Sequence, residues 1–144
     1  MRALLTRSLL LSLLPLALAS QGCNTYSYVD LDLKTSPLFN TAQYGRVNTC
    51  QVFVTGGATD DFTLDFATCK GRDPATGRIA KVQYSTFADS GSSLTFTLHL
   101  FGSVKDASCD MGHAATTVTV DGGKTVAGAI TVDYANPPSD PNCP

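Results

Sequence analysis

LTFTLHLF, at residues 94–101, alternates apolar and mostly polar side chains without a break. Leu94, Phe96, Leu98 and Leu100 share one face of an extended chain, and the side chains between them share the other. A period of two is typical of a β-strand that has one face in the core and one face in water. We therefore expect a half-buried strand here, and it is the clearest strand in the chain.

Other parts of the chain repeat this alternation, and turns rich in Gly and Asp separate them. No window of helical length keeps a 3.6-residue period after the N-terminal segment. Two of the turns, at residues 88–93 and 121–124, are predicted to be hairpins. The other expected strands lie at residues 29–33, 50–54, 62–66, 80–84, 117–121 and 125–134.

The composition supports a β protein. All twelve acidic residues are Asp, a residue that favours turns, and Glu is absent. About seven strands with one apolar face each predict an all-β fold, an antiparallel Ig-like β-sandwich, and a small β-barrel is the alternative. Without repeats or a linker, residues 23–144 are expected to form a single domain that ends in a Pro-rich tail at 136–144.

The first 22 residues have the features of a secretory signal peptide. Arg2 and Arg7 precede an apolar segment, Leu9 to Leu18, that is too short to span a membrane. LALASQGC, at residues 16–23, resembles the lipobox of bacterial lipoproteins. That resemblance implies that Cys23 receives a diacylglyceryl group on sulfur, becomes the mature N-terminus and is then N-acylated, typically with palmitate. The alternative is cleavage after Ala19 without a lipid.

The chain has five cysteines: Cys23, Cys50, Cys69, Cys109 and Cys143. In an oxidising compartment an odd number leaves one cysteine without a disulfide partner. If Cys23 carries lipid, the other four can form two disulfides. The local pairing, Cys50–Cys69 with Cys109–Cys143, is favoured, and Cys69–Cys109 with Cys50–Cys143 remains open.

The local pairing makes a demand on strand register. Pairing the apolar positions Val52 and Phe66 across two strands puts Thr68, not Cys69, opposite Cys50. We therefore expect a β-bulge between these strands if the local disulfide forms.

Few residues suggest chemistry. His99 is expected to be solvated on the polar face of its strand, and His113 to lie in a loop. Cys109, Asp110 and His113 are too few for a four-ligand zinc site, so no metal and no cofactor are predicted. The two acids at residues 30 and 32 are interpreted as charges on an edge strand that discourage aggregation. Three aromatic residues fall on nominally polar faces and would form a binding patch if they met: Tyr28, Phe53 and Phe101.

Three functions fit these features. The first is a non-enzymatic lipoprotein of the bacterial cell envelope, placed at the outer membrane, with a structural or binding role. Its partners would be the lipid bilayer, through acylated Cys23, and an unidentified protein or glycan. The second is a soluble secreted binding module. The third is a small secreted hydrolase, which the absence of a catalytic motif disfavours. After removal of the signal peptide, twelve acids face eight bases, so no nucleic acid partner is expected.

Overall fold

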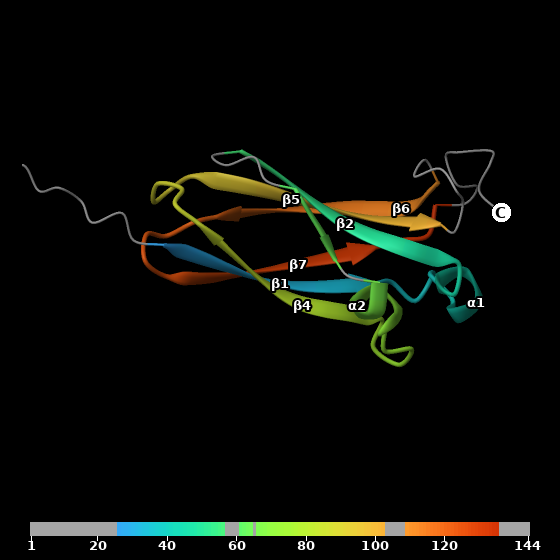
Figure 1. Cartoon of the computed structure of the whole chain (residues 1–144). Coiled ribbons are helices and arrows are strands. Elements are labelled where there is room, and N and C mark those ends of the chain that lie inside the picture. Colours follow the sequence, from blue (N-terminus) through green and yellow to red (C-terminus); the bar gives the residue numbers. More distant parts are fainter. Residues whose placement is uncertain (1–25, 57–60, 65, 103–108, 136–144) are drawn as a thin grey trace, which may run out of the picture.

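The computed structural model describes residues 26–135, except for 57–60, 65 and 103–108. Seven strands form two sheets that pack face to face (Figure 1). The all-β sandwich is therefore confirmed, and the two sheets stay open rather than closing into a barrel. The strands are β1 (Ser27–Thr35), β2 (Val47–Gly56), β3 (Phe62–Leu64), β4 (Arg78–Thr86), β5 (Ser93–Gly102), β6 (Asp110–Thr119) and β7 (Thr125–Val132), and the short helices are α1 (Thr41–Tyr44) and α2 (Phe66–Lys70).

The two sheets differ in size and pairing. Sheet A has the order β4-β1-β7, and sheet B has the order β3-β2-β5-β6. All pairs are antiparallel except β1 and β7, which run parallel. In a constant-type immunoglobulin domain the first, second, fourth and fifth strands share one sheet. Here the second, third, fifth and sixth strands share a sheet, so the sandwich has a different strand order.

The core follows the alternation seen in the sequence. The apolar face of β5 is completely buried, whereas the threonines on its other face are only partly covered. β2, its neighbour in sheet B, buries its apolar face on the same side, and β1 buries its own apolar face from sheet A. Dry packing of such faces is the main stabilising contribution in a sandwich of this size. The fully buried members include Val29, Leu31, Leu33, Val52, Val54, Leu94, Phe96, Leu98 and Leu100.

Two expected hairpins are wrong. Residues 88–93 join β4 to β5, and residues 121–124 join β6 to β7, and in both cases the two strands belong to different sheets. Gly91 and Gly123 have positive φ angles of 89° and 73°, as tight turns require. The local turn chemistry was therefore predicted correctly, but it does not distinguish a hairpin from a turn that crosses between sheets.

Cys50 and Cys69 form a disulfide with a Cα–Cα distance of 6.0 Å, as the local pairing predicts. The expected register is wrong, because Cys50 pairs with Leu64. Instead of a bulge, β3 ends at Leu64 and the chain forms α2, which carries Cys69 back to Cys50. This bond excludes the alternative pairing.

Three cysteine predictions fall partly or wholly on residues that are not described. Cys109 is disulfide-bonded. Its expected partner, Cys143, lies outside the described residues, together with the tail at 136–144. Cys23 and the predicted signal peptide at 1–22 lie outside them too.

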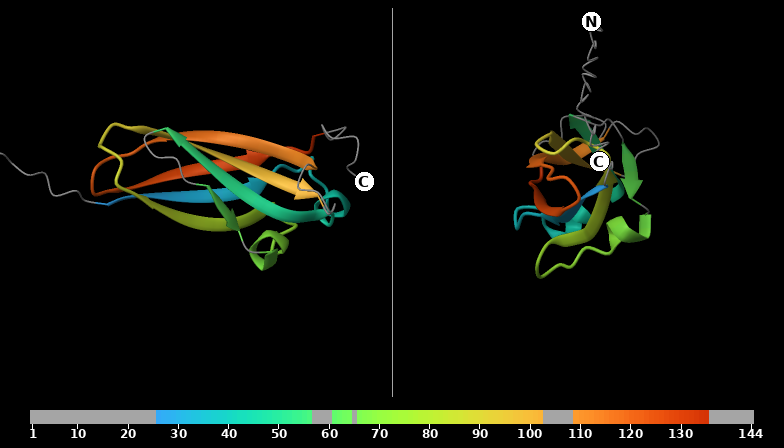
Figure 2. Two further views of the ribbon diagram at one scale, coloured as in Figure 1. Left: turned by 45° about the horizontal axis from the view of Figure 1, so that its top comes forward. Right: turned by 90° about the vertical axis from the view of Figure 1, so that its left-hand side faces the viewer.

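The sandwich is elongated, and its two ends differ (Figure 1, Figure 2). We call the end where β1 begins the N-terminal pole. The turns after β4 and β6 meet there, since the Ser27 hydroxyl donates to the Asp121 carbonyl and the Gly91 N–H donates to the Val120 carbonyl. The opposite end, which we call the distal pole, holds α1, the end of β7 and the start of β6.

Candidate functional site

A β-bulge in β6 brings three polar side chains together on the outer face of sheet B. His99 of β5 lies directly opposite His113 of β6. The register then shifts, so that Phe101 pairs with Asp110 and Met111 is the extra residue. Met111 is buried while Asp110 and His113 lie on the outer side. Without the bulge, Asp110 would point to the opposite face from His113, because residues an odd number of positions apart in a regular strand lie on opposite faces.

The two imidazoles share one carboxylate oxygen. Asp110 Oδ2 lies 3.0 Å from Nδ1 of His99 and 2.7 Å from Nδ1 of His113. The other oxygen, Oδ1, accepts the backbone N–H of Gly112 at 3.0 Å. The side chains of His99 and Asp110 are 23% and 18% exposed, whereas that of His113 is 60% exposed. The cluster is therefore fixed from within the sheet and open toward solvent.

Aromatic rings hold His99 in place. The Phe53 ring from β2 meets the imidazole edge-on with a centroid distance of 5.0 Å, and Phe101 stacks on it at 5.6 Å. The ring of His113 stacks on the same imidazole at 4.8 Å. Two of the three aromatics that the sequence left on polar faces thus lie around one histidine. Tyr28 belongs to β1, in the other sheet.

The structure corrects the sequence interpretation of both histidines. His99 is not simply solvated, because it is bonded to Asp110 and enclosed by rings. His113 belongs to β6 rather than to a loop. Alternation hid this site because the bulge breaks the period of two between Asp110 and His113. The local signal is the set of Cys109, Asp110 and His113, which the sequence predicts to be part of a loop with too few ligands for zinc.

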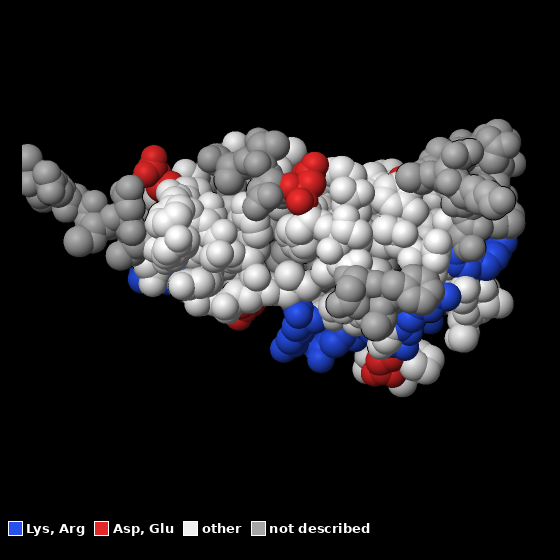
Figure 3. Space-filling model, viewed as in Figure 1, with Lys and Arg blue, Asp and Glu red and all other residues white. Residues whose placement is uncertain are grey.

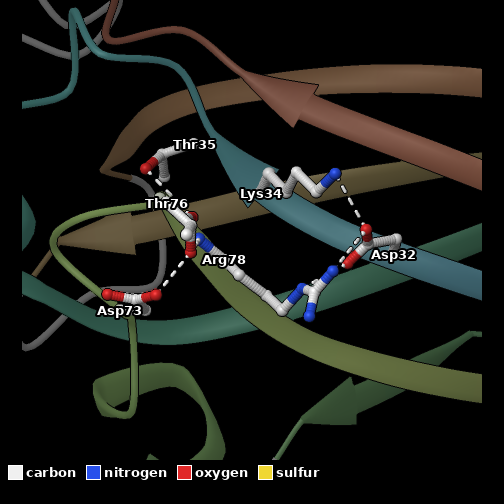
Figure 4. Close-up of polar contacts among 7 residues, drawn as sticks. Asp32, Lys34, Thr35, Asp73, Thr76 and Arg78 are labelled. Carbon is white, nitrogen blue, oxygen red and sulfur yellow. Dashed lines mark hydrogen bonds and ion pairs between the residues drawn. The ribbon is translucent and has the colours of Figure 1, made fainter.

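A second polar group lies on the outer face of sheet A (Figure 4). The Arg78 guanidinium donates twice to Asp32, from Nε at 2.9 Å and from Nη2 at 3.2 Å, and Lys34 Nζ lies 2.8 Å from the same carboxylate. Partial burial alone would raise the pKa of Asp32, but the hydrogen bonds and positive charges of Lys34 and Arg78 outweigh it and hold that pKa below its ordinary value. Figure 3 shows basic side chains gathered over β4 and around the two helices.

A groove formed by residues of sheet A lies beside this group. It has a volume of about 620 Å³ and is lined by Asp30, Gln83 and the small residues Ala127 and Ala129, among others. Its two acids are already bonded, since Gln83 donates to Asp30 at 2.8 Å and Arg78 donates to Asp32. The prediction that Asp30 and Asp32 protect an edge strand is wrong, because β1 is the central strand of sheet A. These acids instead bond across the sheet to β4.

The distal pole is held together around a buried tyrosine. The hydroxyl of Tyr44, the last residue of α1, donates to the Cys69 carbonyl in α2 at 2.5 Å. Burial raises the pKa of Tyr44 to about 12. The Arg72 guanidinium lies 5.0 Å from the centre of the Tyr44 ring and donates to the Phe39 carbonyl at 2.8 Å. These contacts stabilise the distal pole and do not by themselves indicate a reactive site.

Exposed aromatic side chains occur at the N-terminal pole. Tyr26 and Phe87 are 48% and 57% exposed and contact each other, with ring centroids 3.7 Å apart. They lie just beyond Ser27 and Thr86, which pair across β1 and β4. This pole therefore presents aromatic rings beside the point where the described chain begins.

Comparisons with known proteins do not show a family for this chain. No family model and no curated protein match the chain. A crystal structure of a fimbrial assembly protein from Parabacteroides distasonis matches with a TM-score of 0.45 and 11% identity over 75% of this chain. The match covers 53% of that protein, so this chain spans about half of its length. Among the described residues, no helix is both long and apolar enough to cross a membrane.

Proposed function

We propose that the chain is a lipid-anchored β-sandwich of the bacterial cell envelope, at the outer membrane, with a non-enzymatic binding or structural role. The use of the cysteines is the observation that carries this proposal. Cys50 and Cys69 bond to each other, and Cys109 is also disulfide-bonded. Because the total is odd, one cysteine has no disulfide partner, and it cannot be any of these three. The remaining candidates are Cys143 and Cys23, and only Cys23 follows a lipobox-like sequence.

The N-terminal pole suits a membrane surface. Tyr26 lies three positions after Cys23, so a lipid on Cys23 would hold this pole within roughly 10 Å of the acyl chains. Tyr and other aromatic side chains favour the membrane–water interface, where the ring meets lipid and the polar tip meets water. Tyr26 and Phe87 are exposed and in contact with each other, which supports such a role for this pole. Two or more acyl chains anchor a protein stably, whereas one chain alone is marginal.

A binding or structural role fits the described surface better than hydrolysis does. The imidazoles of His99 and His113 both bond to Asp110, and in the described residues no serine or threonine hydroxyl bonds to either ring. The groove on sheet A does not include these histidines. A nucleophile and a base within hydrogen-bond reach of each other are the minimum for covalent hydrolysis.

The experiment compares the intact mass, free thiols and membrane fractionation of three chains: wild type, Cys23→Ser and Cys143→Ser. We expect the wild type to begin at Cys23, carry acyl groups, have no free thiol and sediment with the outer membrane. Cys23→Ser should lose the lipid and the membrane fraction but still have no free thiol. Cys143→Ser is the matched control, and it should keep the lipid and expose one free thiol.

A wild-type chain that begins at Ser20 without an acyl group would contradict the proposal and indicate a secreted module. A free thiol appearing in Cys23→Ser would contradict it as well, because Cys23 would then be a disulfide partner. If the wild type hydrolyses a fluorogenic ester or peptide and His113→Ala abolishes that hydrolysis, the result would support the hydrolase instead.

A further inference from the structure

We propose that His99, Asp110 and His113 form a binding site for a divalent transition-metal ion, with Zn²⁺ as the representative. Each of the three side chains offers one ligand atom, and these atoms all lie within 4.8 Å of one another. Two imidazoles and a carboxylate suit Zn²⁺, Ni²⁺ or Cu²⁺ rather than Mg²⁺ or Ca²⁺, which prefer all-oxygen ligands. This inference goes beyond the proposed envelope role and does not depend on the lipid.

The ligand atoms already converge. Nδ1 of both rings lies 3.0 Å or less from Asp110 Oδ2. Zinc bonds to nitrogen and oxygen of about 2.0–2.2 Å place neighbouring ligands roughly 3.3 Å apart. A small outward movement of the carboxylate would therefore admit an ion. Each ring would then carry its proton on Nε2 and offer the Nδ1 lone pair to the metal.

Supporting contacts fix the ligands before any ion arrives. The Gly112 N–H holds Asp110 Oδ1, which leaves Oδ2 for the ion. Phe53 and Phe101 limit rotation of the His99 ring. The cross-strand pairing of His99 with His113 sets the distance between the rings through the backbone. Contacts of this kind orient metal ligands and raise affinity in known metal sites.

The site is open on one side. His113 is 60% exposed, and the cluster faces solvent on the outer side of sheet B. Three protein ligands leave a position for water or for a donor atom from a partner, as in zinc sites that react or bind. His99 lies six positions after Ser93 in β5, so the site lies roughly 20 Å along the strand from its start near the N-terminal pole. In a lipid-anchored chain, an ion there would lie roughly that far from the pole proposed to face the membrane.

The two histidines and Asp110 contribute little to the stability of the sandwich, so stability alone does not explain why they lie together. Exposed ion pairs contribute between zero and about 1 kcal/mol. Because His113 is well exposed, its replacement should leave the fold intact. The fold and the metal can therefore be tested separately.

The test is calorimetric titration of Zn²⁺ into the purified, untagged, chelator-treated chain without reductant, because free thiols would themselves bind zinc. We expect one Zn²⁺ per wild-type chain. Replacing one ligand, in His113→Ala or in Asp110→Asn, should weaken the affinity by about tenfold or more. Asp30→Asn is the matched control, because Asp30 is also an acid on an outer face but lies on sheet A, where it is bonded to Gln83. The Zn²⁺ affinity of this variant should equal that of the wild type.

Nitrogen NMR gives a second readout. The chain has only two histidines, so the imidazole spectrum contains two ring systems. Zn²⁺ should move the Nδ1 signals of both rings, and the unfolding temperature of apo His113→Ala should match that of the apo wild type. No binding at millimolar Zn²⁺, unchanged ring signals, or equal affinity in wild type and His113→Ala would each overturn the proposal.

Discussion

Replacing both Cys50 and Cys69 with alanine removes the disulfide that ties α2 to β2. The bond spans a sequence separation of 19 residues. In the loop-entropy account, freeing a loop of that size in the unfolded chain lowers the free energy of unfolding by about 3 kcal/mol. Given the unfolding entropy of a domain of this size, the melting temperature should fall by roughly 12 °C.

The assay is urea and thermal unfolding followed by far-ultraviolet circular dichroism, without reductant. Cys50 and Cys69 are buried, with exposed fractions of 0% and 1%, so replacing them with alanine also removes packing contacts of the two sulfur atoms. The double variant Cys50→Val with Cys69→Val is the control, because valine restores most of the lost volume. If chain entropy dominates, the two double variants should agree within about 1 kcal/mol.

Two results would refute this reasoning. A loss of less than about 1 kcal/mol in both double variants would mean that the bond constrains the unfolded chain very little. A large loss in the alanine pair with none in the valine pair would assign the effect to packing of the sulfurs. In the first case the Tyr44 contact to the Cys69 carbonyl, rather than the disulfide, would be what holds α2 in place.

Three further predictions test the sandwich. Gly77→Ala should cost about 2 kcal/mol or more in urea unfolding, because φ is +71° and a Cβ would lie 2.3 Å from the Thr35 carbonyl oxygen; an unchanged midpoint would contradict this. Arg78→Met should lower stability by at most about 1 kcal/mol at neutral pH. Since the folded pKa of Asp32 is depressed, that difference should shrink as the pH falls below 3.8, and a pH-independent difference would contradict it. Leu98→Ala should cost about 2–5 kcal/mol, and a loss below 1 kcal/mol would mean that the core refills the cavity.

The strands could be predicted from the sequence because each buries one face. Leu94 and Leu98 alternate with polar residues, and both are buried as that alternation requires. Strand order could not be predicted, because the same alternation fits any partner. The turn at residues 121–124 has hairpin chemistry yet connects two sheets, and only packing of the whole domain decides that outcome.

The candidate site was harder to predict than the fold. His99 and His113 become neighbours only through the pairing of β5 with β6. Asp110 joins them only because Met111 is accommodated in a bulge. A bulge moves one side chain to the opposite face, so reading faces by counting residues in twos fails there. The sequence drew attention to all three residues but did not indicate that their side chains lie on the same face of one sheet.

The parallel pairing of β1 with β7 has a mechanical consequence. The pair runs in continuous register from Tyr28 with Thr125 to Thr35 with Val132. β1 begins at the N-terminal pole, and β7 ends at the distal pole. A pull between these two ends would load the evenly spaced hydrogen bonds of the pair together, in shear, rather than opening them one after another. The domain is thus built to transmit tension along its long axis without unzipping.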